Sequence, residues 1–121
     1  MRLIVLGGIY IHDFDDIVGP QVESALEGLH VTTLFVGADG VSPERGLTTD
    51  NVLEAGLYRQ MARIAERVVA VTDSAKIGLD KLQTILPFEN LHTFITDTGA
   101  PAGFVQMLKE KGVSVLLAPV L

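Results

Sequence analysis

The segment FVGADGVSPERGLTTDNVLEAG, residues 35–56, shows how this chain passes from a strand to a helix. Its apolar start ends at Val36, small and acidic residues follow, and a helical pattern begins near Asn51. The segment VVAVTDSAKIG, residues 68–78, repeats the same order. In α/β proteins such junctions lie outside the carboxyl ends of parallel strands, where ligands bind. The two segments therefore predict an α/β domain with a small-molecule site.

The rest of the chain continues the alternation of short apolar runs with amphipathic stretches. The patterns predict strands at 2–6, 32–36, 68–72, 92–96 and 113–118, and helices at 20–29, 51–67, 79–86 and 101–111. Residues 9–18 are expected to be irregular, and residues 37–49 to form a long loop. Alternation requires crossover connections, so we expect a mostly parallel, Rossmann-like sheet with helices on both faces.

Composition restricts the classes of function. The 121 residues suit one domain, and the net charge of −6 argues against direct contact with nucleic acid. The absence of cysteine fits a reducing compartment, and no apolar run is long enough to span a membrane, so we expect a cytoplasmic protein. An apolar content of 48% predicts that part of the surface meets a partner subunit.

Four predicted strand ends carry residues suited to an oxygen-rich ligand. They are Gly7-Gly8, the stretch Gly37 to Gly40 with Asp39, the stretch Thr72 to Lys76 with Asp73, and the stretch Thr96 to Gly99 with Asp97. Glycine lets backbone approach a ligand, and carboxylates accept hydrogen bonds from sugar hydroxyls. Lys76 is the cation of these loops, and Glu54 in the first turn of the long helix is expected opposite it.

Each candidate also has a structural interpretation. Asp after a strand most often caps a helix or a turn, a single Lys is most often solvated, and a Gly-Gly pair most often forms a tight turn. Asp13, Asp15 and Asp16 are expected to form a solvated loop, and the three histidines have no metal-type spacing, so we expect no metal. Convergence of several candidates is what favours a site.

Several chemistries lack their motifs. The chain contains no G-x-S-x-G, no Walker-type G-x-x-x-x-G-K-[ST] and no G-x-G-x-x-G after a strand. These absences disfavour a hydrolase, a P-loop NTPase and a dinucleotide enzyme. We therefore expect no cofactor and no catalytic residue.

The ordered motifs resemble the C-terminal effector domain of the DeoR family of bacterial transcriptional regulators. The matching stretches are LGG (6–8), VGP (18–20), FVGADGV followed by GLTT (35–49), EA (54–55), TDSAK (72–76) and FITD (94–97). The resemblance implies a fold similar to ribose-5-phosphate isomerase, glucosamine-6-phosphate deaminase and coenzyme A transferases. It also implies a pocket for a phosphorylated sugar or related metabolite.

By position, the family's pocket motifs match Asp39, Gly40, Thr48, Thr49, Glu54, Asp73 and Lys76. The resemblance implies that Lys76 contacts phosphate or a sugar oxygen and that Glu54 and Asp39 accept from hydroxyls. The family's helix-turn-helix and its upstream βα segment have no counterpart among residues 1–121, which we expect to be one partial effector domain. DNA would then be bound only through a separate domain, and an exposed sheet edge would favour homo-oligomers.

Three functions follow from these patterns. The first is a non-enzymatic, oligomerising effector domain of a regulator of carbohydrate metabolism. The second is a sugar-phosphate isomerase or deaminase, in which Glu54 or Asp39 abstracts a proton and Lys76 stabilises the enediolate. The third is a dimerisation module with a vestigial pocket.

Overall fold

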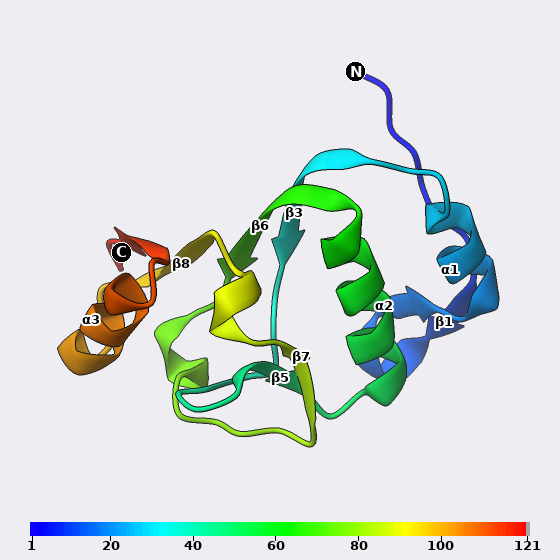
Figure 1. The fold of residues 1–121 in the computed structure, drawn as a ribbon. Helices are drawn as coiled ribbons and strands as arrows, with labels where there is room; N and C mark the ends of the chain where they lie inside the picture. The colour runs from blue at the N-terminus through cyan, green and yellow to red at the C-terminus, as the bar shows by residue number, and fades with distance from the viewer. Residues whose placement is uncertain (121) are drawn as a thin grey trace.

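The computed structural model describes residues 1–120, which form an α/β structure around a four-stranded parallel sheet (Figure 1). The strands of this sheet are, in spatial order, β3 (Val31–Val36), β6 (Ala65–Val71), β8 (Thr93–Asp97) and β9 (Ser114–Ala118). Every neighbouring pair is parallel. The predicted alternation of strands and helices is confirmed between β3 and β6 and between β8 and β9, whereas no α-helix lies between β6 and β8.

Two helices cover one face of the parallel sheet. Helix α2 (Val52–Arg63) and helix α3 (Ala102–Glu110) contribute Ala55, Phe104 and Leu108 to the main core, where they meet Phe94 of β8. Asn51 caps α2 by accepting from the backbone N–H groups of Leu53 and Glu54. Helix α3 ends before Gly112, which adopts a φ of 84°.

The opposite face of the parallel sheet carries exposed apolar side chains. Val71 of β6 lies opposite Ile95, which lies opposite Leu116, so the three side chains share this face. Val71 and Leu116 are exposed, and Phe35 of β3 is 67% exposed. The prediction of helices on both faces is therefore wrong for the described residues, because both sheet-packing helices lie on the core side.

A second, three-stranded antiparallel sheet adjoins the core. It consists of β4 (Gly40–Ser42), β5 (Gly46–Thr49) and β7 (Gln83–Leu86) in that order. The predicted long loop at 37–49 and the predicted helix at 79–86 are both wrong. The Thr48 hydroxyl accepts from the N–H of Lys81, and Arg45 donates to the carbonyls of Lys81 and Leu82. These backbone groups therefore bond to side chains instead of forming the hydrogen bonds of a helix.

A small hairpin and the first helix form the other end of the molecule (Figure 1). The hairpin pairs β1 (Ile9–Ile11) with β2 (Asp16–Val18) around a short 3-10 turn (η1, His12–Phe14), and α1 (Pro20–Leu26) follows. The prediction that residues 9–18 are irregular is therefore wrong, and the predicted helix ends three residues early. Val22 and Leu26 of α1 pack with Leu57 of α2 in a second core.

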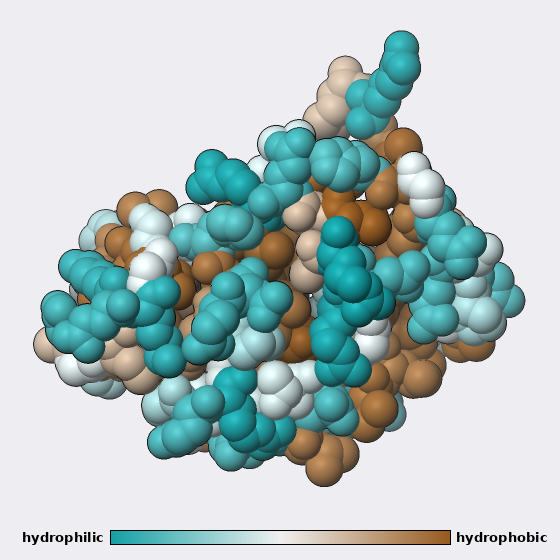
Figure 2. Space-filling view, viewed as in Figure 1, coloured by the Kyte–Doolittle hydropathy of each residue, from teal (hydrophilic) through white to brown (hydrophobic). Residues whose placement is uncertain are grey.

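The predicted strand at 2–6 is also wrong. Residues 1–7 have no regular secondary structure, and Leu3 and Ile4 are each 77% exposed. A strand forms only where a neighbour supplies hydrogen bonds, and none of the strands described pairs with this run. Figure 1 shows residues 1–7 extending away from α1. Figure 2 shows apolar colour around the adjoining hairpin, where Ile9 and Phe14 are exposed.

Two further 3-10 turns complete the described elements, namely η2 (Ser74–Lys76) after β6 and η3 (Phe88–Asn90) after β7. The first of these follows the carboxyl end of a parallel strand. The second follows Pro87, at the amino end of β8. The two turns therefore contribute to opposite ends of the parallel sheet.

Candidate functional site

Asp39 lies just beyond the carboxyl end of β3, in the short link to β4. Its backbone N–H donates to the carbonyl of Thr48 at 3.0 Å, and its Oδ2 accepts from Thr49 Oγ1 at 2.6 Å. The β4–β5 hairpin therefore fixes both the backbone and the carboxylate of Asp39. Charged hydrogen bonds of this kind hold a carboxylate in one orientation.

Thr48 and Thr49 are fully buried, and their hydroxyl groups already have partners in the chain. Thr48 Oγ1 donates to the carbonyl of Gly40 at 3.1 Å and accepts from the N–H of Lys81. Thr49 Oγ1, besides donating to Asp39, accepts from the N–H of Asn51 at 3.1 Å. The two threonines thus position Gly40, Asp39 and the start of α2.

Gly40 sits where no side chain fits. A Cβ added at this position would lie 2.4 Å from the carbonyl oxygen of Leu79 and 2.9 Å from Thr48 Oγ1. The glycine is therefore required for the close approach of β4 to residues 78–79. This approach also lets Gly78 donate to Val41 at 2.8 Å.

Glu54 lies in the first turn of α2 and is only 8% exposed. Burial, followed by the negative charges of Asp16 and Asp39, raises the pKa of its carboxyl to about 7. A hydrogen bond with Asp16 also favours the protonated form. The structure thus places Glu54 within the electrostatic influence of Asp39.

Two residues of this cluster were not predicted from the sequence. Asp16 comes from the hairpin, and Tyr58 follows Glu54 by one helical turn on α2. The Tyr58 hydroxyl donates to Asp16 Oδ2 at 3.1 Å, and burial followed by the charges of Glu54 and Asp16 raises the pKa of Tyr58. Tyr58 could have been found from its i, i+4 spacing to Glu54. Asp16 could not, because its position depends on a hairpin predicted to be irregular.

Lys76 ends η2 and reaches across to the β3–β4 link. Its Nζ donates to the carbonyl of Ala38 at 3.4 Å, directly beside Asp39. The structure thus brings Lys76 and Asp39 together at the carboxyl ends of β3 and β6, while Glu54 approaches Asp39 from α2.

Asp73 and Asp97 hold the backbone of the neighbouring loops. Asp73 accepts from the N–H of Ala75 at 3.0 Å and so caps η2, the structural role weighed for it above. Asp97 accepts from the N–H groups of Ser74 and Gly99, each at 2.8 Å, and a hydrogen bond with the Ser74 side chain, followed by these two backbone bonds, lowers its pKa. Both carboxylates therefore define the turn on which Lys76 sits.

Gly7 and Gly8 lie before the hairpin, outside any strand. A Cβ at Gly8 would lie 2.4 Å from Val22 Cγ2 and 2.8 Å from the carbonyl oxygen of Val18. Gly8 therefore allows the chain to pack against α1 and β2. The structure gives neither glycine a contact with Asp39, Glu54 or Lys76, because the predicted strand that would have aligned them does not form.

Among residues 1–120, no group of three or more His, Cys, Asp or Glu side chains is arranged to hold a metal ion. Within the same residues, no helix combines the length and apolar character needed to cross a membrane. The class defined by the fold and site is an α/β domain with a polar cluster at the carboxyl ends of its parallel strands.

The family is shown by comparison with known proteins. Residues 1–98 match the model of the DeoR C terminal sensor domain, and the chain belongs to this family. It is 36% identical over 117 residues to the "Putative aga operon transcriptional repressor" of Escherichia coli O157:H7, covering 97% of this chain and 44% of that protein. It is 34% identical over 100 residues to the HTH-type transcriptional regulator GlpR of Haloferax volcanii, covering 83% of this chain and 39% of that protein.

A third relative is the "Uncharacterized HTH-type transcriptional regulator YulB" of Bacillus subtilis. The identity is 28% over 119 residues, covering 98% of this chain and 46% of that protein. The chain thus spans less than half the length of these three relatives. The resemblance inferred from the motifs is confirmed at the level of the sensor-domain family.

Proposed function

We propose that this chain is the effector-binding part of a bacterial transcriptional regulator of carbohydrate metabolism and that its effector is a phosphorylated sugar or a related metabolite. Membership of the sensor-domain family supports the regulatory class. Relatives named for an aga operon and, in Haemophilus influenzae, for an L-fucose operon support the link to carbohydrates. In the whole protein, a separate helix-turn-helix domain would contact DNA in the cytoplasm.

The observation that carries the proposal is the convergence of Lys76, Asp39 and Glu54. They come from three separate segments, and the Lys76–Ala38 bond and the Glu54–Asp39 interaction bring them to one edge of the sheet. A lysine on one of these loops, together with carboxyl groups on the neighbouring segments, would suit a ligand with one phosphate and several hydroxyl groups. Lys76 would bind the phosphate, and Asp39 and Glu54 would accept from the hydroxyls.

The remaining residues would support this site. Thr48 and Thr49 hold Gly40 and Asp39, and Asp73 shapes the turn that carries Lys76. Gly40 would support the site by allowing β4 to pack closely against residues 78–79. Gly7 and Gly8 would act only through the packing of the hairpin. Oligomerisation through the exposed apolar face of the sheet completes the proposal.

We further propose that the domain binds its effector without converting it. The comparisons find proteins named as transcriptional regulators, and they do not favour an isomerase or deaminase. An effector acts on such a domain by binding one conformation better than another, so it requires affinity rather than turnover. No cofactor is needed for that task.

Isothermal titration calorimetry on the 121-residue chain tests the proposal. The titrants are ribose 5-phosphate and glucosamine 6-phosphate, with ribose and glucosamine as controls without phosphate. We expect binding of a phosphorylated sugar that weakens at least tenfold in Lys76→Ala and in Asp39→Asn. Lys109→Ala removes an exposed cation of α3 and is the matched control, with affinity unchanged.

Three results would contradict the proposal. The first is equal affinity in the Lys76→Ala variant and the unmodified chain, which would place the ligand elsewhere. The second is turnover of either sugar phosphate that disappears in Glu54→Gln, which would make the domain an enzyme. Failure of every sugar phosphate to bind would remove the proposed class of effector.

A further inference from the structure

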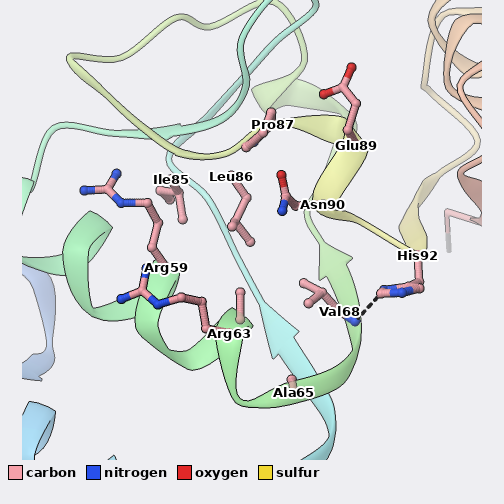
Figure 3. Close-up of a pocket in the computed structure, with 11 residues that line it drawn as sticks. Arg59, Arg63, Ala65, Val68, Ile85, Leu86, Pro87, Glu89, Asn90 and His92 are labelled. Carbon is pink, nitrogen blue, oxygen red and sulfur yellow. Dashed lines mark hydrogen bonds between the residues drawn. The ribbon is translucent and has the colours of Figure 1, made fainter.

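A separate pocket opens at the amino end of the parallel sheet (Figure 3). Its volume is about 470 Å³. Apolar side chains of Val68, Ile85 and Leu86 line it, and the last turns of α2 add Arg59 and Arg63. Asp39 and Lys76 follow the carboxyl ends of the strands, so this pocket lies at the other end of the sheet from the proposed effector site.

The two arginines are placed on the same side of α2. They are four residues apart, and Figure 3 shows their side chains running in the same direction. Arg59 Nη1 donates to the carbonyl of Thr84 at 2.6 Å, which holds this guanidinium against β7. The remaining N–H groups of Arg59 and the whole guanidinium of Arg63 have no hydrogen-bond partner among residues 1–120.

The charge of this pair is not balanced by the nearest carboxylate. Glu89 lies at the edge of the pocket, yet its carboxylate pairs with Lys111 Nζ at 3.3 Å. Among the described residues, neither Arg59 nor Arg63 forms a salt bridge, although the chain as a whole carries a net charge of −6. Like charges at i, i+4 repel each other, and a bound anion would remove this repulsion.

The wall across from the arginines carries polar side chains besides Glu89. Asn90 lies there, and His92 is oriented by accepting from the backbone N–H of Val68 through Nδ1 at 3.0 Å. An imidazole that accepts at Nδ1 while neutral carries its proton on Nε2. The pocket therefore combines an apolar lining with hydrogen-bond donors and two cations at its edge.

We propose that this pocket binds a small organic anion. Arg59 and Arg63 contact its phosphate or carboxylate group, and its apolar part packs on Ile85 and Leu86. The site is distinct from the proposed effector site, because Glu54 and Arg63 are nine residues apart on α2, a rise of about 14 Å along the helix. The same helix thus connects a site near its first turn with another near its last.

Titration of the 121-residue chain at low ionic strength, followed by NMR, tests this proposal. The probes are hexyl phosphate, hexanoate, inorganic phosphate and the uncharged hexanol. We expect at least one of the two amphiphilic anions to shift the amide signals of residues 59–63 and 85–92. The more tightly bound anion identifies the head group that the pocket prefers. Inorganic phosphate and hexanol are expected to bind at least tenfold more weakly. Inorganic phosphate lacks the apolar chain, and hexanol lacks the negative charge.

Variants locate the binding. Arg63→Ala, at an exposed position, should weaken the amphiphilic anion at least fivefold, and Arg63→Glu should abolish binding. Lys109→Ala on α3 should leave the affinity unchanged, and so should Lys76→Ala, which affects only the proposed effector site. Circular dichroism checks that each variant is folded.

The proposal is overturned if neither amphiphilic anion binds or if Arg63→Ala and Arg63→Glu bind as tightly as the unmodified chain. It is also overturned if hexanol binds as tightly as the anions, or inorganic phosphate as tightly as hexyl phosphate. A loss of affinity in Lys76→Ala would assign the anion to the other end of the sheet. The results for hexanol and for the Arg63 variants do not bear on whether sugar phosphates bind at Lys76, so failure of this proposal is distinguishable from failure of the proposed function.

Discussion

The hydroxyl of Tyr58 donates to Asp16 across 3.1 Å and joins two parts of the molecule that are 42 residues apart in sequence. Tyr58 belongs to α2, and its side chain packs against both the main core and the smaller core below α1. Asp16 belongs to the hairpin and lies beside Glu54 because this bond holds it there. One hydrogen bond therefore helps to set both the packing of the hairpin and the electrostatics of the candidate site.

Replacing Tyr58 by Phe should destabilise the protein by about 1–2 kcal/mol, because it leaves the half-buried Asp16 carboxylate without its donor. Urea unfolding followed by circular dichroism measures this change. Tyr10→Phe is the matched control, since Tyr10 also donates to an aspartate, Asp15, but is exposed. Equal losses of unfolding free energy in the two variants would show that the Tyr58 bond stabilises the protein no more than the exposed Tyr10 bond does.

The stability of the protein should depend on the ionisation of Glu54. Its pKa in the folded state is about 7, against 4.5 as the ordinary value, so the folded state binds the proton more tightly than the unfolded state. The free energy of unfolding therefore falls as pH rises from about 4.5 to about 7. Below that range Glu54 is protonated in both states and its contribution is constant.

Glu54→Gln removes this ionisation and should stabilise the protein by about 1 kcal/mol at pH 8, with no gain at pH 4. Chemical unfolding of both proteins at the two pH values gives the difference. A difference that is the same at pH 4 and pH 8 would mean that Glu54 titrates normally in the folded state.

Gly40→Ala should destabilise the protein by roughly 1–3 kcal/mol, because the new Cβ would meet the backbone carbonyl of Leu79 at 2.4 Å. Gly56→Ala is the control, since no atom lies within 4 Å of its Cβ and Gly56 is inside α2. That change should stabilise by about 0.5–1 kcal/mol. Thermal unfolding distinguishes the two variants. A stabilised Gly40→Ala variant would disprove the close approach of β4 to residues 78–79.

The two faces of the parallel sheet should respond differently to truncation. Phe94 is fully buried against Phe104, so Phe94→Ala should cost about 3–5 kcal/mol. Phe35 is 67% exposed on the other face, and Phe35→Ala should change the stability of the monomeric chain by no more than about 0.5 kcal/mol. Urea unfolding of the 121-residue chain tests both. A large loss in Phe35→Ala would indicate that this face is covered in solution.

Elements with a strong local pattern were predicted well. The apolar spacing around Leu57 and the Asn51 cap act within one or two helical turns, and α2 begins within a residue of its expected start. The strands that became β3, β8 and β9 were also found within two residues, because each is a short apolar run bounded by turn residues. Helix α2 ends earlier than expected, at Arg63, because β6 begins at Ala65.

Elements that depend on distant partners were not predicted. The strand β7 forms at residues expected to be helical, because β5 supplies its hydrogen bonds from more than thirty residues away. Conversely, Arg2 to Leu6 has the pattern of a buried strand and remains exposed because no described strand pairs with it. Apolar character alone does not distinguish these outcomes, since it does not reveal which backbone groups find partners.

For the candidate site, the sequence alone determined which residue types stand at the strand ends, including Asp39, Asp73 and Lys76, because a strand followed by small polar residues is a local pattern. Only the tertiary structure decided that Lys76 reaches Ala38 and that Asp16 and Tyr58 join Glu54. It also decided that the hydroxyl groups of Thr48 and Thr49 form hydrogen bonds within the chain. The physical reason is that hydrogen bonding and burial depend on which segments meet in space, and these segments are far apart along the chain.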